Sequence, residues 1–214
     1  CWCARMKPRD VMTDLIVLVA DQNMLATVRG LMDRRKSLKL GEGFSFEVRP
    51  HPEHDPGCFL RGHEFLAPFQ RQYCYGLVIF DREGCGSNAD RELLEKEVEE
   101  RLASRGWKGR SAAIVIDPEL ENWVWSESPH VADQLGWKNR TTDLRTWLRT
   151  SGDLLAEALK PTRPKEAMEK VLRTTRRPRS STIYEALAHK VGLSSCRDPA
   201  FAKFRSVLAG WFPS

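Results

Sequence analysis

The sequence predicts an α/β protein in which helices cover both faces of a mostly parallel sheet, giving three layers, followed by a helical C-terminal extension. Three short apolar runs at 14–20, 75–81 and 111–117 have the composition of strands that are buried on both sides. Segments of helical periodicity separate these runs, which is the pattern of parallel strands joined by crossover helices. The strand pattern ends at about residue 127.

The segments between the buried strands complete the predicted sheet and its helices. Residues 23–38 carry apolar side chains at helical spacing and end in basic residues, where cations interact favourably with the helix dipole. Residues 44–50 alternate and end on Pro50, as a strand near the edge of a sheet would. Residues 89–107 carry an apolar stripe that closes at Gly106, which predicts a second helix.

Residues 51–65, HPEHDPGCFLRGHEF, are predicted to be a turn-rich loop, because they contain two prolines and a glycine near the end of a strand. A structural loop is the favoured interpretation. The alternatives are contact with substrate or phosphate through His51 and Arg61, and a zinc site. No paired C-x-x-C is present among the six cysteines, and the spacing in 51–65 matches no zinc motif, so zinc is weakly supported.

The last third of the chain is predicted to be helical. Helices are expected within 142–155, 164–172, 180–193 and 198–212, with N-caps at Asp143, Ser181 and Asp198. The stretch between Pro161 and Ser181 is rich in proline and arginine and is expected to be partly loop. We therefore predict an N-terminal extension at 1–11, an α/β domain at 12–127, and a basic helical region at 128–214 packed on it. The first boundary rests on Met12 as a possible natural start.

Composition and hydropathy place the chain among ordinary globular proteins. It has 214 residues, of which 41% are hydrophobic and 29% are charged. No apolar run reaches the roughly 18 residues needed to cross a bilayer, and the first residues lack the apolar core of a secretory signal. These observations predict a cytoplasmic protein without a membrane partner.

Charge is distributed unevenly along the chain. Residues 138–214 contain 16 Lys and Arg against 7 Asp and Glu, for a net charge of +9, whereas residues 1–137 carry −4. A basic segment of this kind is either a solvated helical surface or a face that follows a phosphate backbone. DNA or RNA is therefore a candidate partner.

Acidic residues follow three of the predicted strands. Asp21 comes after the first buried strand, Asp81 and Glu83 after the second, and Glu119 and Glu121 shortly after the third. Open α/β sheets bind their ligands at the carboxyl ends of the strands, and side chains one residue apart in an extended segment face the same way. Carboxylates suit Mg²⁺ or Mn²⁺ better than zinc, so the pattern predicts a site for one of these cations.

An ordinary structural role is the alternative for each of these residues. An acidic residue at a strand end often caps the next helix or faces water. The three separate strand ends together favour the metal site over that alternative.

The acidic pattern resembles the TOPRIM family, a Rossmann-like fold found in topoisomerases, primases and nucleases. The motifs that carry the resemblance are FDREGCG, with its acidic-x-acidic pair, and IDPELENWVWSESPHV. Together with VADQNM, HPEHDPGC, PKEAMEKVL and DPAFAKF, the chain from Met12 onward is similar to small TOPRIM-related proteins encoded among bacterial restriction and anti-phage genes, and most narrowly to a component of the methylation-associated defence system.

The resemblance implies a Mg²⁺- or Mn²⁺-dependent nuclease of anti-phage defence. Asp21 would act near the nucleophile or as general base, and Asp81, Glu83 and one of Glu119 or Glu121 would hold the metal. The chain departs from the family at Asp21, which is followed by Gln22, where TOPRIM enzymes usually have Glu followed by Gly. The expected partners are DNA or RNA and other proteins of the same defence locus, and a homo-oligomer is left open.

Two alternatives of other classes stay open. One is a catalytically silent regulatory or binding subunit of a defence complex, which the departure at Asp21 supports. The other is a response-regulator receiver with Asp81 as phosphoacceptor, which is disfavoured because Asp117 and Glu119 follow the strand where a receiver needs Lys.

Arginines near residue 175 are the leading candidates for nucleic-acid contact, because guanidinium groups bind phosphates in bidentate fashion. A solvated loop is an equally supported alternative. The complete predicted set is His51, Arg61, Lys165, Arg173, Arg176, Arg177 and Arg179. Trp123, Trp125, Trp137 and Trp147 are expected to pack in the core in preference to stacking on bases.

Overall fold

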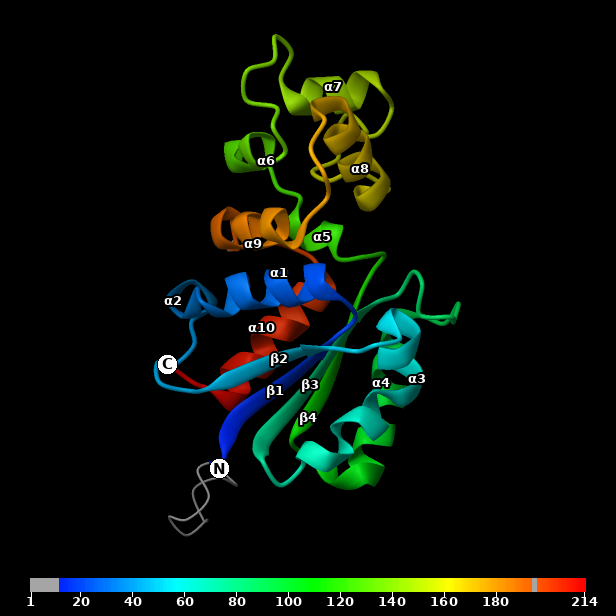
Figure 1. Cartoon of the computed structure of the whole chain (residues 1–214), viewed down its shortest axis with the longest axis vertical. Helices are drawn as coiled ribbons and strands as arrows, with labels where there is room; N and C mark the ends of the chain where they lie inside the picture. Colours follow the sequence, from blue (N-terminus) through cyan, green and yellow to red (C-terminus); the bar gives the residue numbers. More distant parts are fainter. Residues whose placement is uncertain (1–11, 194–195) are drawn as a thin grey trace.

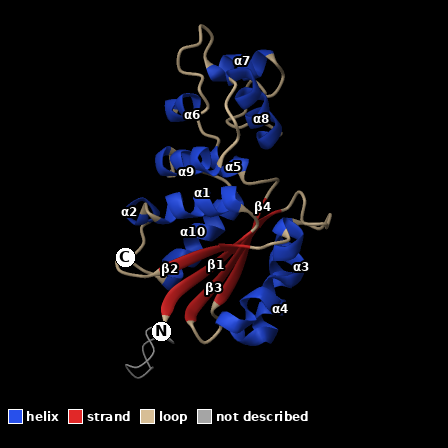
Figure 2. Ribbon diagram, viewed as in Figure 1, coloured by secondary structure: helices blue, strands red, loops and turns tan. Residues whose placement is uncertain are grey.

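The computed structural model describes residues 12–193 and 196–214, and it contains a four-stranded parallel sheet (Figures 1 and 2). The strands are β1 (Thr13–Val19), β2 (Phe46–Pro50), β3 (Tyr73–Asp81) and β4 (Ser111–Ile116). Their order is β2-β1-β3-β4, and every neighbouring pair is parallel. The predicted α/β class with a parallel sheet and C-terminal helices is confirmed, and the strand ending at Pro50 lies at an edge.

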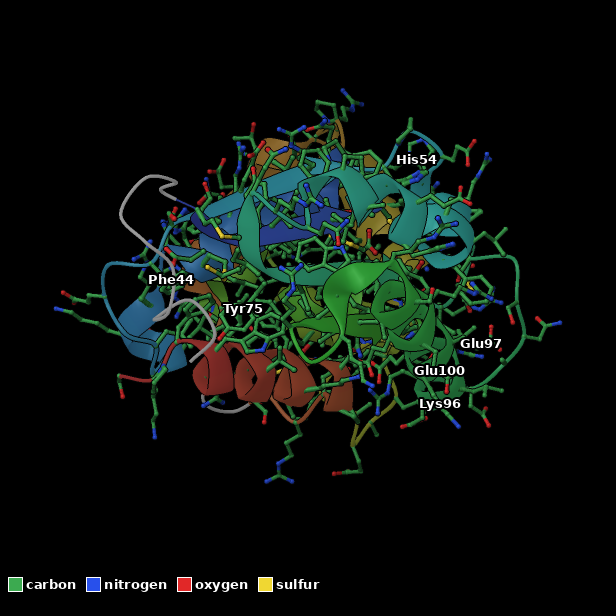
Figure 3. The ribbon with its side chains drawn as sticks, turned by 90° about the horizontal axis from the view of Figure 1, so that it is seen from below. Phe44, His54, Tyr75, Lys96, Glu97 and Glu100 are labelled. Carbon is green, nitrogen blue, oxygen red and sulfur yellow. The ribbon has the colours of Figure 1, made fainter. Side chains whose placement is uncertain are left out.

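Helices cover both faces of this sheet. On one face lie α3 (His54–Leu66) and α4 (Arg91–Leu102), where the ring centroids of Phe59 and Phe80 are 6.0 Å apart. On the other lie α1 (Gln22–Met32) and α10 (Pro199–Trp211), where Tyr75 stacks on Trp211 at 4.7 Å. Figure 3 shows Phe44 and Tyr75 beside the end of α10. Because α10 packs on the sheet itself, the end of the chain completes the third layer.

The expectation of a loop at 51–65 is wrong, because α3 occupies most of that segment. Pro56 is the third helical residue, in the first turn, where its missing N–H is not needed by the helix. Cys58, Phe59 and Leu66 bury one side of the helix against the sheet. Composition suggested a loop here, whereas burial of this apolar side stabilises a helix.

The remaining helices lie mostly beyond the carboxyl ends of the strands (Figure 1). Asp143 and Asp198 cap their helices as expected, whereas Ser180 precedes the helix for which Ser181 was the expected cap. The elements are α5 (Glu121–Val124), α6 (Pro129–Gln134), α7 (Leu144–Thr150), α8 (Pro164–Thr175) and α9 (Ser181–Lys190). The short helices α2 (Arg35–Leu38), η2 (Ala67–Phe69) and η3 (Ala103–Trp107) complete the described elements.

Close packing of α9 on α1 attaches this C-terminal region to the α/β core. A Cβ atom at Gly30 would lie 2.9 Å from the Cβ of Ala188, so the two helices approach as closely as a glycine allows. The Arg34 guanidinium also donates to the carbonyls of Ala188 and Val191 over 2.8 and 2.7 Å. The predicted packing role of the tryptophans is confirmed, since Trp123, Trp125 and Trp137 are buried and Trp147 packs against the core.

No helix within 12–193 or 196–214 has the length and apolar character that crossing a membrane requires. The N-terminal extension predicted at 1–11 lies outside the described residues.

Candidate active site at the carboxyl edge of the sheet

Two carboxylates meet where β3 ends and α3 begins. Asp81 is the last residue of β3, and its backbone N–H donates to Oδ1 of Asp55 over 2.8 Å. Asp55 lies in the first turn of α3, where a carboxylate interacts favourably with the helix dipole. Oδ1 of Asp81 is buried and has no hydrogen-bond partner within the described residues. A buried acceptor of this kind is costly unless a proton or a cation reaches it.

Burial and mutual repulsion make this pair a poor place for two negative charges. Burial raises the pKa of Asp81 well above its usual range, and the charges of Asp55 and Glu121 raise it further. Burial also raises the pKa of Asp55, where the hydrogen bond from Asp81 opposes the shift and the charge of Asp21 adds to it. The pair is therefore suited to sharing a proton or binding a cation.

Asp21 follows β1 and caps α1. Its Oδ1 accepts a hydrogen bond from the N–H of Met24 over 2.8 Å. The same carboxylate lies near enough to Asp55 for its charge to raise the pKa of Asp55. Asp21 thus combines the structural role that sequence reasoning offered as its alternative with a position beside the acidic pair.

The two glutamates after β4 are buried and held by the C-terminal helices. Glu119 is 6% exposed, and its Oε1 accepts from the backbone N–H of Lys165 over 2.9 Å, while the Lys165 ammonium lies 3.7 Å from Oε2. Burial raises the pKa of Glu119, and the backbone and charge of Lys165 oppose that shift. This contact joins the loop after β4 to the start of α8.

Glu121 is 1% exposed and begins α5. The Arg179 guanidinium donates to its Oε1 over 2.7 Å, and the Tyr184 hydroxyl donates to the same oxygen. Burial and the Glu121 charge raise the pKa of Tyr184. Burial lowers the pKa of Arg179, but Tyr184 and Glu121 outweigh that effect, so its pKa is raised. Glu121 is therefore matched by a cation from the segment between α8 and α9.

Glu83 does not share one extended segment with Asp81, contrary to expectation, because the strand ends at Asp81 and residues 82–84 turn. The Glu83 backbone N–H donates to the carbonyl of Pro118 over 3.0 Å, and its exposed side chain lines a pocket of about 250 Å³ with Glu119 and Lys165. Glu119 and Glu121 likewise fall in a loop and a helix and not in a strand.

Glycine shapes the turn that follows β3. Gly84 and Gly86 both have positive φ, at 95° and 88°, a backbone conformation that residues with a side chain rarely adopt. A Cβ at Gly84 would lie 3.8 Å from Oδ2 of Asp55. The turn therefore leaves the Asp55 carboxylate bordered by bare backbone.

The described part of the chain contains no group of three or more His, Cys, Asp or Glu side chains arranged to hold a metal ion. Mg²⁺ is commonly bound through one or two carboxylates, with water and substrate phosphate as the other ligands. Asp55 and Asp81 supply two carboxylates, one with a buried oxygen that has no partner among residues 12–193 and 196–214, so the donor set fits such an ion.

The residues predicted to contact nucleic acid lie in different settings. His51 is 6% exposed, its Nδ1 accepts from the Glu53 N–H over 3.1 Å, and burial lowers its pKa. Arg61 pairs with Glu53, and Arg177 donates to the carbonyl of Gln134. Arg173 and Arg176 are exposed. Lys165 and Arg179 lie at the carboxyl edge, paired with Glu119 and Glu121. His51 lies at the same edge directly after β2, where its N–H donates to the carbonyl of Val19.

Comparison of the chain with protein-family models, curated proteins and solved structures gave no match.

Sequence reasoning missed Asp55 as a member of the site, because it assigned 51–65 to a loop. The position of Asp55 in the chain, shortly after the strand that ends at Pro50, could have indicated its place in the site. A helix that starts directly after β2 places its first-turn residues at the carboxyl edge of the sheet, beside the end of the neighbouring strands.

Proposed function

We propose that the carboxyl edge is a Mg²⁺- or Mn²⁺-dependent site for hydrolysis of nucleic-acid phosphodiesters. The observation that carries the proposal is the buried Oδ1 of Asp81, which has no partner in the described part of the chain and lies next to the carboxylate of Asp55. A divalent cation would satisfy that oxygen and remove the repulsion between the two carboxylates.

The side chains have separate roles in this proposal. Asp55 and Asp81 hold the cation, which when bound polarises a phosphoryl oxygen and lowers the pKa of a bound water. Asp21, whose charge acts on Asp55, would accept a proton from the attacking water. Lys165 and Arg179 supply positive charge at the same edge and suit the phosphates that flank the scissile bond.

The resemblance to TOPRIM-related proteins of restriction and anti-phage loci supports a biological setting for this chemistry. We propose that the protein acts in bacterial defence against phage, with DNA or RNA as substrate and other proteins of its locus as partners. The basic C-terminal region, net +9 over 138–214, is consistent with a polyanionic substrate.

Purified protein incubated with single- and double-stranded DNA and RNA tests the activity. Cleavage is expected with Mg²⁺ or Mn²⁺ and not with EDTA, and it should be lost in Asp81→Asn and Asp55→Asn. Asp117→Asn is the matched control, because Asp117 also follows a strand of this edge but is half exposed and pairs with Arg82 over 2.9 Å. Its activity should be unchanged.

Cation binding is measured independently by thermal unfolding with and without Mg²⁺. A ligand that binds only the folded state raises the melting temperature, and this rise should vanish in Asp81→Asn. If no nucleic acid is cleaved, alone or with the proteins encoded beside it, and Mg²⁺ leaves the melting temperature unchanged, the nuclease proposal fails.

A second candidate is a catalytically silent subunit that binds nucleic acid or a partner protein. Its support is that Glu119 and Glu121, two of the predicted metal ligands, already pair with Lys165 and Arg179. This candidate predicts salt-dependent nucleic-acid binding that weakens in Arg173→Glu and Arg176→Glu and is unchanged in Asp81→Asn.

A further inference from the structure

The strand β4 forms one edge of the sheet, so only one of its sides pairs with another strand. The outer side of an edge strand presents N–H and C=O groups that can pair with any other extended chain. In this protein the outward N–H groups of Ala113 and Val115 both donate hydrogen bonds, although no strand of the described residues lies beside them.

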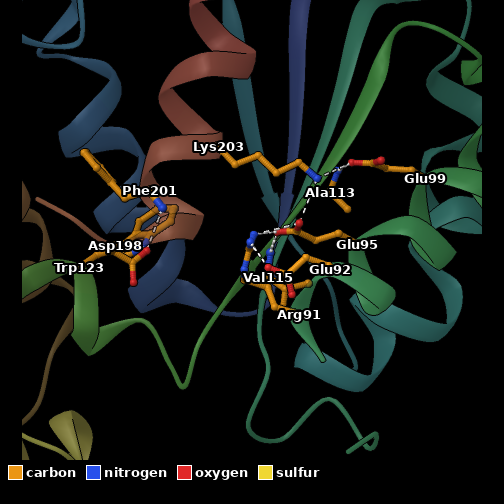
Figure 4. Close-up of polar contacts among 10 residues, drawn as sticks. All are labelled: Arg91, Glu92, Glu95, Glu99, Ala113, Val115, Trp123, Asp198, Phe201 and Lys203. Carbon is orange, nitrogen blue, oxygen red and sulfur yellow. Dashed lines mark hydrogen bonds and ion pairs between the residues drawn. The ribbon is translucent and has the colours of Figure 1, made fainter. Parts of the chain in front are cut away.

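Two glutamates of α4 take the place of a neighbouring strand. Oε1 of Glu99 accepts from the N–H of Ala113 over 3.0 Å, and Oε1 of Glu95 accepts from the N–H of Val115 over 3.0 Å (Figure 4). Glu95 and Glu99 are four residues apart on one helix face, and Ala113 and Val115 are two apart on one strand side. The spacing of the acceptors therefore matches the spacing of the donors.

Cations from two helices hold these carboxylates against the strand. Lys203 of α10 lies 2.8 Å from Glu99 and 3.1 Å from Glu95, and so bridges them from the opposite face of the sheet. Arg91 donates to both oxygens of Glu95 over 2.8 and 3.0 Å. Glu95 is 4% exposed, and these cations compensate the free-energy cost of burying its negative charge.

Other charged residues of α4 behave differently. Lys96 and Glu100 form an exposed pair at 3.9 Å, and Figure 3 shows them with Glu97 at the outer side of the helix. Only Glu95 and Glu99 turn to β4. The other edge strand, β2, is short, ends on Pro50 and carries charged residues, which are themselves features that discourage pairing.

We propose that Glu95, Glu99 and Lys203 form a latch that closes the β4 edge against pairing with a second copy of this chain. The occupant that it excludes is the β4 edge of another molecule, because two identical edges can meet across a two-fold axis and satisfy the same N–H groups. Opening the latch exposes a continuous edge of six residues.

Glu99→Ala tests the latch, with Glu100→Ala as the matched control on the exposed side of the same helix. Hydrogen exchange of the Ala113 amide should become at least about fivefold faster in Glu99→Ala, because its acceptor is gone, and should be unchanged in Glu100→Ala. Sedimentation velocity over a concentration series should show more self-association than the wild type in Glu99→Ala alone. Glu99→Gln keeps an acceptor oxygen and should stay close to the wild type in both measurements.

Either of two results overturns the proposal. One is Ala113 exchange in Glu99→Ala that is as slow as in the wild type. The other is faster exchange with no increase in association. If Glu99→Ala does not fold, Lys203→Met gives a second test at Ala113, because it removes the cation that holds Glu99, while Arg91 still holds Glu95. Arg205→Met, on the same helix, is then the control.

Discussion

Asp81 donates its backbone N–H to the carboxylate of Asp55, while its own Oδ1 is buried and has no hydrogen-bond partner among the described residues. This hydrogen bond joins the end of β3 to the first turn of α3 and fixes two carboxylates at the carboxyl edge of a parallel sheet. This hydrogen bond therefore also holds the two carboxylates close together, where two negative charges are unfavourable. That imbalance is the physical basis of the proposed cation site.

We expect the stability of the cation-free protein to fall as pH rises, through the contribution of Asp81. Its folded-state pKa is raised, so the folded state binds the proton more tightly than the unfolded state. The stabilisation is fully present below about pH 4, the ordinary range of an aspartate, and is lost as pH rises through the folded pKa. Urea unfolding at a series of pH values, with EDTA present, measures the effect.

Asp81→Asn cannot ionise and should show a flatter pH dependence than the wild type, with higher stability at neutral pH. Asp117→Asn should follow the wild type. A wild-type curve that parallels that of Asp81→Asn would show that the Asp81 carboxyl does not titrate as its burial requires.

Substitutions at Asp21 can separate its structural role from its chemical one. Asp21→Ala removes the cap of α1 and should cost about 1 kcal/mol in the free energy of unfolding. Asp21→Ser retains a capping oxygen and should keep most of that stability. If Asp21 accepts a proton in the reaction, both variants lose cleavage, whereas a purely structural role predicts an active Asp21→Ser.

The buried carboxylate of Glu121 should make Arg179 important for stability. Arg179→Met leaves Glu121 with Tyr184 as its remaining side-chain donor and should cost about 2 kcal/mol, measured by urea unfolding. Glu121→Gln in the same chain should recover much of the loss, because it removes the uncompensated charge. Arg173→Met, an exposed arginine of the same region, should change stability by less than about 0.5 kcal/mol. Equal losses in Arg179→Met with and without Glu121→Gln would argue against charge pairing.

The contact between α1 and α9 should depend on the absence of a side chain at Gly30. Gly30→Val places methyl groups against Ala188 and the carbonyl of Glu185, and it should destabilise the protein by about 1 to 3 kcal/mol. Gly210→Ala is the contrasting change, because no described atom lies within 4 Å of the added Cβ in α10 and alanine favours a helix. It should be neutral or stabilising by up to about 1 kcal/mol, and thermal unfolding compares the two.

The local hydrophobic pattern predicted the strands of the sheet correctly, but it did not predict the helix that follows β2. Continuous apolar runs such as 14–20 and 75–81 predict strands covered on both faces, and these strands form as expected. Residues 54–66 contain residue types that favour turns, yet they form a helix because Cys58, Phe59 and Leu66 bury one side against the sheet. Packing outweighed composition there, and Asp55 entered the site as a consequence.

By itself, the sequence determined the parallel α/β core and the placing of acidic residues at its carboxyl edge, since both follow from short-range periodicity and from the end at which each strand stops. Only the tertiary structure decided which charges meet. Lys165 lies 46 residues from Glu119 and Arg179 lies 58 from Glu121, so no local pattern could pair them. Their partners are set by where α8 and α9 pack. Among the described residues, neither Asp55 nor Asp81 forms an ion pair, and the two are joined instead by the Asp81 backbone N–H.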